Sequence, residues 1–329
     1  MIEPANFVVE KKAVYLGKKK KQEPRFSVVS LFSGCGGMDL GFTGGFESHG
    51  TFYEDLPFDI VWANDINEAA CNTYRTNLSN VIKHGDVRDA ISTLPQSADV
   101  VVGGFPCQDI SINGKRKGIA GDRSGLYTSM VSAVERCKPK VFVAENVKGL
   151  LLKYNEESLS QILADFRALG YTVSYKLYLA ANYGVPQMRE RVFLVGTAPG
   201  VKSFVTPDPT HPKHSWITCK QAIGDLEDAE HNREKSHIWS LAKKSSDQGS
   251  RVLKEHSPSD TIRAECHGNI QFHYRLPRRM SMREAARMQS FPDDFLFKSG
   301  IRETERQVGN AVPPVLAWHI ANAVKDTLL

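Results

Sequence analysis

The feature that most constrains the fold of this chain is a pair of short apolar runs, at residues 100–102 and 141–144. Both are rich in valine and bounded by turn residues, a pattern typical of buried strands in a parallel sheet. The first run leads to Pro106-Cys107-Gln108 and the second to Glu145-Asn146. Because open α/β sheets bind ligands at the carboxyl ends of their strands, we expect the Cys107 thiol and the Glu145 carboxyl to share one pocket.

The chain before this pair carries three further turns of a ligand-binding type. An expected strand at 27–32 runs into the glycine-rich turn Ser33-Gly34-Cys35-Gly36-Gly37, a second strand at 60–63 leads to Asp65, and a third acidic strand end is Asp86. Glycines let a backbone approach a ligand, and an acidic residue after the second strand can accept hydrogen bonds from ribose hydroxyls. The series predicts an adenosine-containing ligand. The glycine spacing differs from Gly-x-Gly-x-x-Gly and argues against a dehydrogenase.

The order of expected strands and helices predicts an α/β fold with a doubly wound, mostly parallel sheet. We attribute the long separation of Gly34 from Asp65 to an inserted loop at 48–58. A capping box beginning at Ser281 predicts a short helix, and a final helix follows Pro314. The chain is therefore divided into a basic N-terminal extension (1–25), an α/β domain (26–198), a smaller irregular domain (199–279), a short helical region (280–303) and a C-terminal segment that returns to the α/β domain (304–329).

Composition limits the class of protein. No apolar run of the 329 residues approaches the roughly 18 that a membrane span needs, and no signal peptide opens the chain, so a cytoplasmic protein without a membrane partner is expected. The six cysteines form no Cys-x-x-Cys pair, and His211, His214, Cys219, Cys266 and His267 match no metal-ligand spacing, so no metal is expected. A net charge of +5 permits a polyanionic partner.

Three groups are candidates for chemistry. Cys107 precedes a glycine-rich loop whose cations favour a thiolate, although a lone cysteine is more often a packed core residue. Glu145 at a sheet edge should have a raised pKa and could donate a proton, although such residues also cap helices. Arg189 and Arg191 alternate before a strand and should share one face, although both could be surface charges. A thiolate, an acid and an adenosine-bearing cofactor suit methyl transfer to C5 of a pyrimidine, in which a thiolate adds at C6 and N3 is protonated.

Together these residues resemble the cytosine-C5 DNA methyltransferase family of the bacterial restriction-modification type. The resemblance covers residues 26–324, and its motifs stand in the usual order: 32–37 for the cofactor, Pro106-Cys107-Gln108 for the nucleophile, Glu145-Asn146-Val147 for the acid, Gln187-x-Arg189-x-Arg191, 278–292 for the ninth motif, and Gly309-Asn310-Ala311-Val312 for the last. It implies a Rossmann-like methyltransferase fold that binds S-adenosylmethionine, with residues 199–279 as a target-recognition domain and 280–303 as the hinge region.

The resemblance also implies roles for individual residues. Cys107 would attack C6, Glu145 would contact N3, and Arg191, with Arg189 in the same motif, would support the cysteine and the base. The cofactor would be surrounded by residues of the strand ends and of the last motif: Phe32, Ser33, Gly34, Cys35, Gly36, Gly37, Asp65, Ile66, Asp86, Val87, Pro106, Leu126, Asn310 and Val312. Contacts to DNA would come from the loop after Cys107 and from the irregular domain: Gln108, Ser111, Lys115, Arg116, Arg123, Thr261 and Arg263.

The expected function is transfer of a methyl group to C5 of a cytosine that is flipped out of a short, specific sequence of double-stranded DNA. We expect a monomer, with a restriction endonuclease encoded nearby as its functional counterpart. An RNA cytosine methyltransferase and a cofactor-binding regulator that has lost catalysis are the alternatives. Cys35 replaces the alanine or leucine usual in the family, and we interpret it as part of the cofactor wall. The loop 108–125 is expected to close over DNA as a lid.

Overall fold

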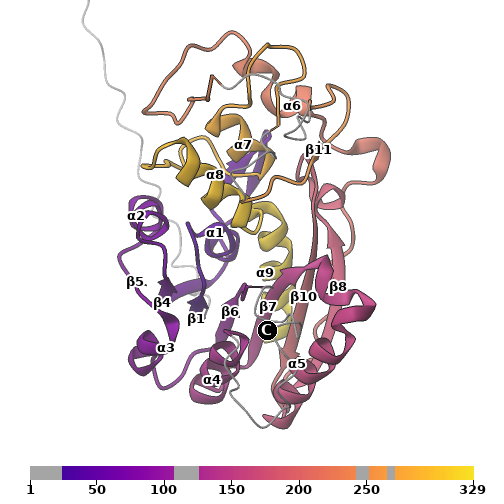
Figure 1. Cartoon of the computed structure of the whole chain (residues 1–329). Coiled ribbons are helices and arrows are strands. Elements are labelled where there is room, and N and C mark those ends of the chain that lie inside the picture. Colours follow the sequence, from indigo (N-terminus) through magenta and orange to yellow (C-terminus); the bar gives the residue numbers. More distant parts are fainter. Residues whose placement is uncertain (1–23, 107–125, 242–251, 265–270) are drawn as a thin grey trace, which may run out of the picture.

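A seven-stranded sheet forms the centre of the molecule in the computed structural model, which describes residues 24–106, 126–241, 252–264 and 271–329 (Figure 1). The strand order is β5-β4-β1-β6-β7-β10-β8. Its strands are β1 (Phe26–Leu31), β4 (Phe58–Asp65), β5 (Ile82–His84), β6 (Val100–Gly103), β7 (Val141–Val147), β8 (Thr172–Leu179) and β10 (Glu190–Thr197). The neighbours from β5 to β7 pair in parallel, whereas β10 is antiparallel to both β7 and β8. The predicted mostly parallel sheet is confirmed.

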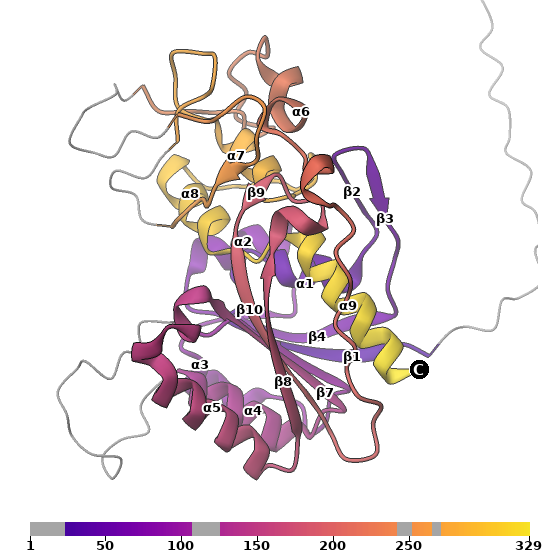
Figure 2. The same cartoon turned by 90° about the vertical axis from the view of Figure 1, so that its right-hand side faces the viewer.

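Helices cover both faces of this sheet, as expected of a doubly wound fold (Figure 2). One face packs against α1 (Gly37–Thr43) and α9 (Pro314–Leu328), and the other against α3 (Val87–Ala90), α4 (Tyr127–Cys137) and α5 (Glu156–Ala168). The remaining helix of this domain is α2 (Glu68–Asn77). The valines at 100–102 in β6 and at 141 and 143 in β7 are completely buried, because side chains on successive positions point to the two covered faces. This burial explains why both strands appear in the sequence as continuous apolar runs.

The last helix is held against the first by a glycine. A Cβ atom at Gly41 would lie 2.4 Å from the Ala317 Cβ and 2.6 Å from the Pro314 carbonyl oxygen. Helices α1 and α9 therefore pack almost backbone to backbone on one face of the sheet. This contact returns the C-terminal segment to the α/β domain, and it places residues 309–312 beside the glycine-rich turn that opens α1.

The rest of the chain forms a second lobe with short elements (Figure 1). These are α6 (Cys219–Ile223), α7 (Met282–Met288), α8 (Ile301–Asn310), and β9 (Gln187–Met188), which pairs in parallel with β11 (Ser259–Asp260). The capping box expected at Ser281 is present and starts α7. Short 3-10 turns occur at 91–93, 148–151, 153–155, 180–183, 213–215 and 224–226. One apolar cluster contains side chains of both lobes, such as Val143 and Met288, and the domain boundaries at 198 and 279 stay predictions.

Two sequence-based expectations need correction. The segment expected to be an inserted loop at 48–58 instead contains most of an antiparallel hairpin of β2 (Phe46–Ser48) and β3 (Thr51–Tyr53). Each strand has three residues, too few to show a periodic pattern. Helix α8 was not expected, and it crosses the proposed boundary at 303. Its sequence is dominated by charged and polar residues, so its buried face carries few apolar side chains.

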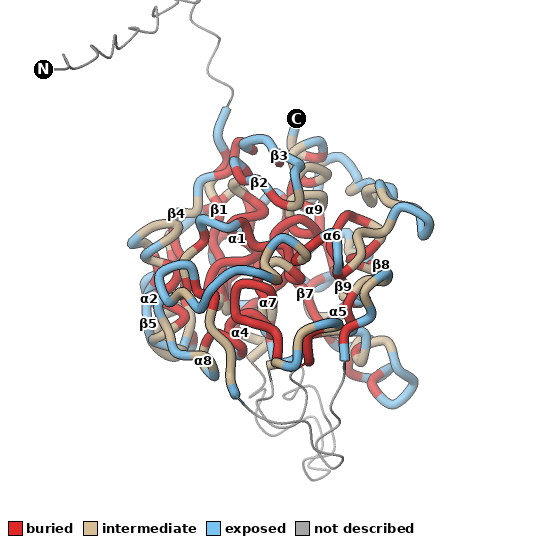
Figure 3. The backbone as a smooth tube through the Cα atoms, turned by 90° about the horizontal axis from the view of Figure 1, so that it is seen from above, coloured by how far each residue is buried: buried red, intermediate tan, exposed pale blue. Residues whose placement is uncertain are grey.

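Burial is concentrated where the sheet, α1 and α7 meet, with exposed residues around the rim (Figure 3). Among the described residues, no helix is long and apolar enough to cross a membrane. Most of the basic extension, residues 1–23, lies outside the described part of the chain.

Candidate active site

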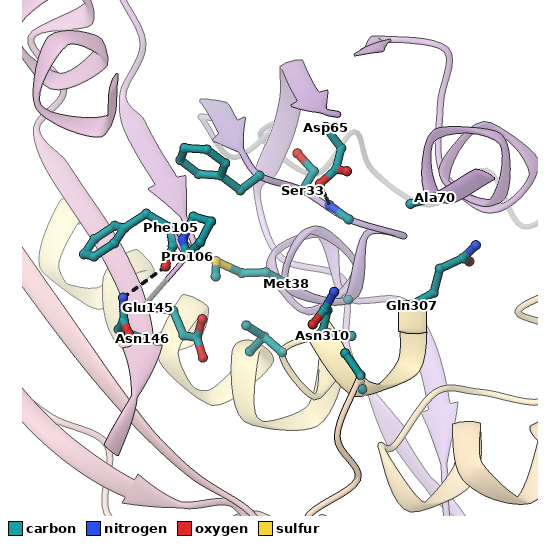
Figure 4. A pocket seen from close by; sticks show the side chains of 18 of the residues that line it. Ser33, Met38, Asp65, Ala70, Phe105, Pro106, Glu145, Asn146, Gln307 and Asn310 are labelled. Atoms are coloured by element: carbon teal, nitrogen blue, oxygen red, sulfur yellow. Dashed lines mark hydrogen bonds between the residues drawn. The ribbon is translucent and has the colours of Figure 1, made fainter. Parts of the chain in front are cut away.

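A cavity of about 1090 Å³ opens at the carboxyl ends of β1, β4, β6 and β7. Further parts of its wall come from the start of β10, from residues 261–264 and from α8. Figure 4 shows Pro106, Glu145 and Asn146 gathered on one side, with Asp65 and Asn310 on others. The strand ends that the sequence pattern brought together therefore do border a single cavity.

The glycine-rich turn forms one wall and is held by Asp65. The two carboxylate oxygens of Asp65 accept hydrogen bonds from the backbone N–H groups of Gly34 and Asn67, each at 2.8 Å. Phe32 and Gly34 have positive φ angles of 55° and 57°, which turn the backbone sharply away from β1. Each carboxylate oxygen can accept a further hydrogen bond, so Asp65 is able to bind a ligand hydroxyl while it holds the turn.

Beneath this turn lies a buried carboxyl that sequence reasoning missed. Asp39 in α1 is fully buried and accepts hydrogen bonds from Ser30 Oγ at 2.6 Å and from the Tyr74 hydroxyl at 2.7 Å. The Ser30 hydroxyl is also 2.9 Å from that of Ser33, which lines the cavity. Burial raises the pKa of Asp39 to about 6. A single acidic residue in a short helix carries no sequence signal for such a role.

Glu145 and Arg191 form a buried ion pair in the opposite part of the cavity wall. The Arg191 Nε and Glu145 Oε1 atoms are 2.7 Å apart, and the side chains are 12% and 11% exposed. Burial raises the pKa of Glu145, and the positive charges of Arg191 and Arg189 oppose this shift. Glu145 is thus a carboxyl in a desolvated site with a raised pKa, as expected from its place at the sheet edge.

The end of β6 is fixed against this ion pair. Asn146 Nδ2 donates a hydrogen bond of 3.0 Å to the Phe105 carbonyl oxygen. A Cβ atom at Gly104 would lie 2.9 Å from Glu145 Oε2, so a larger residue there would displace the Glu145 carboxylate. Pro106 lines the cavity, and Cys107, the next residue, lies outside the described residues.

Arg189 is placed differently from Arg191. It is fully buried and is absent from the cavity wall. Its guanidinium donates hydrogen bonds to the carbonyl oxygens of Ile262, Gly309 and Ala311, at 2.9, 2.8 and 3.0 Å. We expected both arginines to face the site, but only Arg191 reaches the cavity. Arg189 lies between β9 and β10, where neighbouring segments surround it.

Most of the residues expected around the cofactor line the cavity: Phe32, Ser33, Gly34, Gly37, Asp65, Ile66, Asp86, Val87, Pro106, Leu126, Asn310 and Val312. Cys35 and Gly36 do not. Cys35 is 1% exposed, its Sγ lies 3.8 Å from the Gln307 carbonyl oxygen, and burial raises the pKa of its thiol to about 12. A Cβ atom at Gly36 would meet the Leu78 side chain at 2.3 Å. Both residues support the turn from behind.

Other residues of the wall were missed by sequence reasoning. They are supplied by α8, by β9 and the start of β10, and by the turn after β7: Glu303, Arg306, Gln307, Met188, Glu190 and Lys148. Lys148 and Glu190 form an ion pair of 2.8 Å. Only a knowledge of which loops return to the sheet edge would have identified them.

Two residues expected to contact DNA, Thr261 and Arg263, lie in the wall contributed by the second lobe. Arg263 is exposed, whereas the Thr261 hydroxyl donates a hydrogen bond of 2.8 Å to the Met188 carbonyl oxygen. The other expected contacts, Gln108, Ser111, Lys115, Arg116 and Arg123, belong to the loop 108–125 and lie outside the described residues. Within the described ranges, no group of histidine, cysteine and acidic side chains could hold a metal ion.

Comparison with known proteins gives a consistent result. The family model of the C-5 cytosine-specific DNA methylases matches residues 26–256 and 239–326. The Type II methyltransferase M.NgoFVII of Neisseria gonorrhoeae is 37% identical, over 90% of this chain and 86% of that protein. M.FnuDI of Fusobacterium nucleatum, also a Type II methyltransferase, is 33% identical over 92% of this chain and 94% of its own length.

The fold is shared with solved structures. A putative DNA modification methyltransferase from an Escherichia coli prophage superposes with a TM-score of 0.71 at 23% identity, over 92% of this chain and 99% of that one. The Dnmt2 methyltransferase of S. pombe superposes with a TM-score of 0.61 at 18% identity, over 92% of this chain and 99% of its own. At these identities the two structures support the fold alone.

Proposed function

The chain belongs to the family of C-5 cytosine-specific DNA methylases, and we propose that it transfers a methyl group from S-adenosylmethionine to C5 of a cytosine in a short duplex sequence. One observation carries the proposal. A buried carboxyl with a raised pKa, Glu145, borders the same cavity as the turn held by Asp65. An acid and a nucleoside-binding turn that share one cavity are what transfer between a cofactor and a base requires.

The residues of the cavity suit S-adenosylmethionine. The Asp65 carboxylate can accept the ribose hydroxyls, and the exposed Ile66 side chain offers an apolar surface for the adenine ring. Asp86, Val87 and Leu126 would complete the adenine site, and Phe32, Gly34 and Asn310 would surround the methionine part. When bound there, the cofactor supplies an electrophilic methyl group.

In the proposed reaction, the Cys107 thiolate adds to C6 of the cytosine while Glu145 gives a proton to N3. C5 becomes nucleophilic and takes the methyl group. Release of the C5 proton to solvent then breaks the C6–S bond and frees the Cys107 thiolate, and the N3 proton returns to Glu145. Arg191 holds the Glu145 carboxyl at 2.7 Å and would orient it toward the base. The position of Pro106 in the cavity wall supports this role for the residue that follows it.

The target cytosine has to leave the duplex, because C6 is shielded by stacking and the reacting groups lie within a cavity. We propose that DNA lies between the two lobes, with residues 199–279 as the recognition domain. Arg263 is exposed at the cavity edge and could pair with a guanine or a phosphate. The relatives are named Type II methyltransferases, which supports a role as the modification enzyme of a Type II restriction-modification system. A restriction endonuclease encoded nearby would be its functional counterpart.

The test is transfer of tritiated methyl groups from S-adenosylmethionine to unmethylated plasmid DNA and to transfer RNA. We expect labelled DNA only, and bisulfite sequencing of that DNA will give the recognition sequence. Labelling of RNA alone would reject the proposal. A covalent adduct with 5-fluorocytosine DNA that is lost in Cys107→Ser would exclude a regulator without catalysis. Cleavage of the loop 108–125 by a protease at the same rate with and without DNA plus S-adenosylhomocysteine would reject its role as a lid.

A further inference from the structure

Elements β9, α7 and α8 come together in the second lobe (Figure 2). Three completely buried polar side chains lie in β9 or directly after β9 and α7. They are Gln187, Arg189 and Gln289, called here the buried hub. Gln187 Nε2 donates a hydrogen bond of 2.6 Å to Gln289 Oε1. Most buried polar side-chain atoms in proteins are hydrogen-bonded. The hydrogen bonds of the hub are made almost entirely with backbone groups, and Arg189 Nε is the one hub atom that is buried without a partner among the described residues.

On the recognition side, the hub holds both backbone groups of Ile262. The Ile262 N–H donates to Gln187 Oε1 at 3.0 Å, and Arg189 donates to the Ile262 carbonyl oxygen at 2.9 Å. Ile262 lies between Thr261 and Arg263, the two residues that the second lobe is expected to present to DNA. The backbone of this segment is thus fixed from inside the protein.

On the cofactor side, the same hub holds the last motif. Arg189 donates to the carbonyl oxygens of Gly309 and Ala311, at 2.8 and 3.0 Å. Gln289 Nε2 donates to the carbonyl oxygens of Val308 and Ala311, at 2.9 and 2.7 Å. Asn310, between these anchored peptides, lines the cavity (Figure 4).

A direct backbone contact joins the two sides. A Cβ atom at Gly309 would lie 2.4 Å from the Ala264 backbone nitrogen and 2.5 Å from the Arg263 carbonyl carbon. The recognition segment therefore rests on the glycine of the cofactor motif with no side chain between them. Movement of either backbone has to displace the other, since packed interiors transmit displacement.

We propose that the buried hub and Gly309 are positioning elements that couple DNA binding to cofactor binding. The inference rests on the function proposed above. DNA that displaces residues 261–264 when it binds would change the position of Asn310. A cofactor that orders residues 309–311 would in turn order the recognition segment. Because linkage is reciprocal, each ligand would increase the affinity for the other by the same factor.

The test uses the full chain and measures the dissociation constant of S-adenosylhomocysteine, the cofactor product, with and without saturating sheared unmethylated plasmid DNA. We expect DNA to tighten binding about fivefold or more in the wild type. In Gly309→Ala, whose Cβ separates the two backbones, this ratio should fall to within about twofold of one. Gly300→Ala is the matched control at the start of the same helix, because its Cβ would meet nothing within 4 Å, and it should keep the wild-type ratio.

Thr261→Val is a second, milder variant, since it removes the hydrogen bond from Thr261 to the Met188 carbonyl oxygen. Measurement at saturating DNA separates this effect from the loss of any direct contact between Thr261 and DNA. The variant should also lower the ratio, and circular dichroism will show that it is folded. The proposal is overturned if DNA leaves the affinity of the wild type unchanged, or if both variants keep the full ratio. A wild type that methylates plasmid DNA and shows no coupling would refute the hub alone, whereas a wild type that methylates no DNA would refute the proposed function.

Discussion

Replacement of Glu145 by glutamine tests the central ion pair of the cavity. The substitution keeps the shape of the side chain and removes its charge, leaving Arg191 with a neutral partner in a site where the two side chains are 12% and 11% exposed. Breaking one partner of a buried ion pair typically costs about 3–5 kcal/mol, and we expect about 3 kcal/mol here because the pair borders a cavity. Loss of the proton donor should also slow methyl transfer by about 10²-fold or more.

The control for this substitution is Glu190→Gln, at the residue that precedes Arg191 in β10. Glu190 pairs with Lys148 at 2.8 Å, but the two side chains are 37% and 53% exposed. Exposed ion pairs contribute about 0–1 kcal/mol because water screens them, so this variant should unfold at nearly the wild-type denaturant concentration. The two variants remove the same chemical group and differ mainly in burial.

Chemical denaturation gives the stabilities, and transfer of tritiated methyl groups to plasmid DNA gives the rates. Affinity for S-adenosylhomocysteine should stay close to the wild-type value in Glu145→Gln, because the Asp65 turn lies elsewhere in the cavity. If Glu145→Gln transfers methyl groups within about tenfold of the wild-type rate, Glu145 is not the proton donor. If Glu145→Gln is as stable as Glu190→Gln, the buried Glu145–Arg191 ion pair does not contribute the expected free energy of unfolding.

Three further predictions concern the glycine-rich turn and its supports. The pKa of Asp39 is raised to about 6, so the folded protein binds a proton at this carboxyl that the unfolded chain releases, and the contribution of Asp39 to stability falls by about 3 kcal/mol as pH rises from about 4 to 6. Asp39→Asn should remove this contribution, so that its stability falls less than that of the wild type over the same pH range. Denaturation profiles with equal pH dependence would contradict this prediction. Gly37→Ala places a Cβ 2.4 Å from the Val312 carbonyl oxygen. It should lower the free energy of unfolding by about 1–3 kcal/mol and weaken the binding of S-adenosylhomocysteine. The control Gly300→Ala should change neither quantity. The Cys35 thiol, with its pKa raised to about 12, should resist iodoacetamide at pH 8 until urea unfolds the protein, and mass spectrometry that finds it labelled in the folded state would refute its burial.

Strand ends could be predicted from the sequence because their cause is local. Buried parallel strands need continuous apolar runs, and the turns after them need glycine or polar residues. The positions of Asp65, Pro106 and Glu145 on one cavity follow from those runs alone. The family could also be identified, because short motifs with fixed neighbours carried the resemblance.

Residues whose surroundings come from distant segments could not be assigned in this way. Arg189 and Arg191 have the same local sequence context, yet one is enclosed by Ile262, Gly309 and Ala311, and the other faces Glu145. The difference depends on where the chain returns 70 to 120 residues later, which periodicity does not encode. Helix α8 was missed for a related reason, since its buried face includes Thr304, Glu305 and Gln307 rather than an apolar stripe.

The direction of strand β10 explains why Arg191 lies beside Glu145. Glu145 lies near the carboxyl end of β7, and Arg191 lies at the beginning of β10. In a fully parallel sheet the beginning of β10 would lie at the opposite edge, about 20 Å away for a strand of seven residues. Because β10 runs antiparallel to β7, Arg191 pairs with Val147 and is the diagonal neighbour of Glu145 on the same face. The reversed strand is therefore a requirement of this site, and any relative that keeps the Glu145–Arg191 ion pair through these two strands must keep the reversal too.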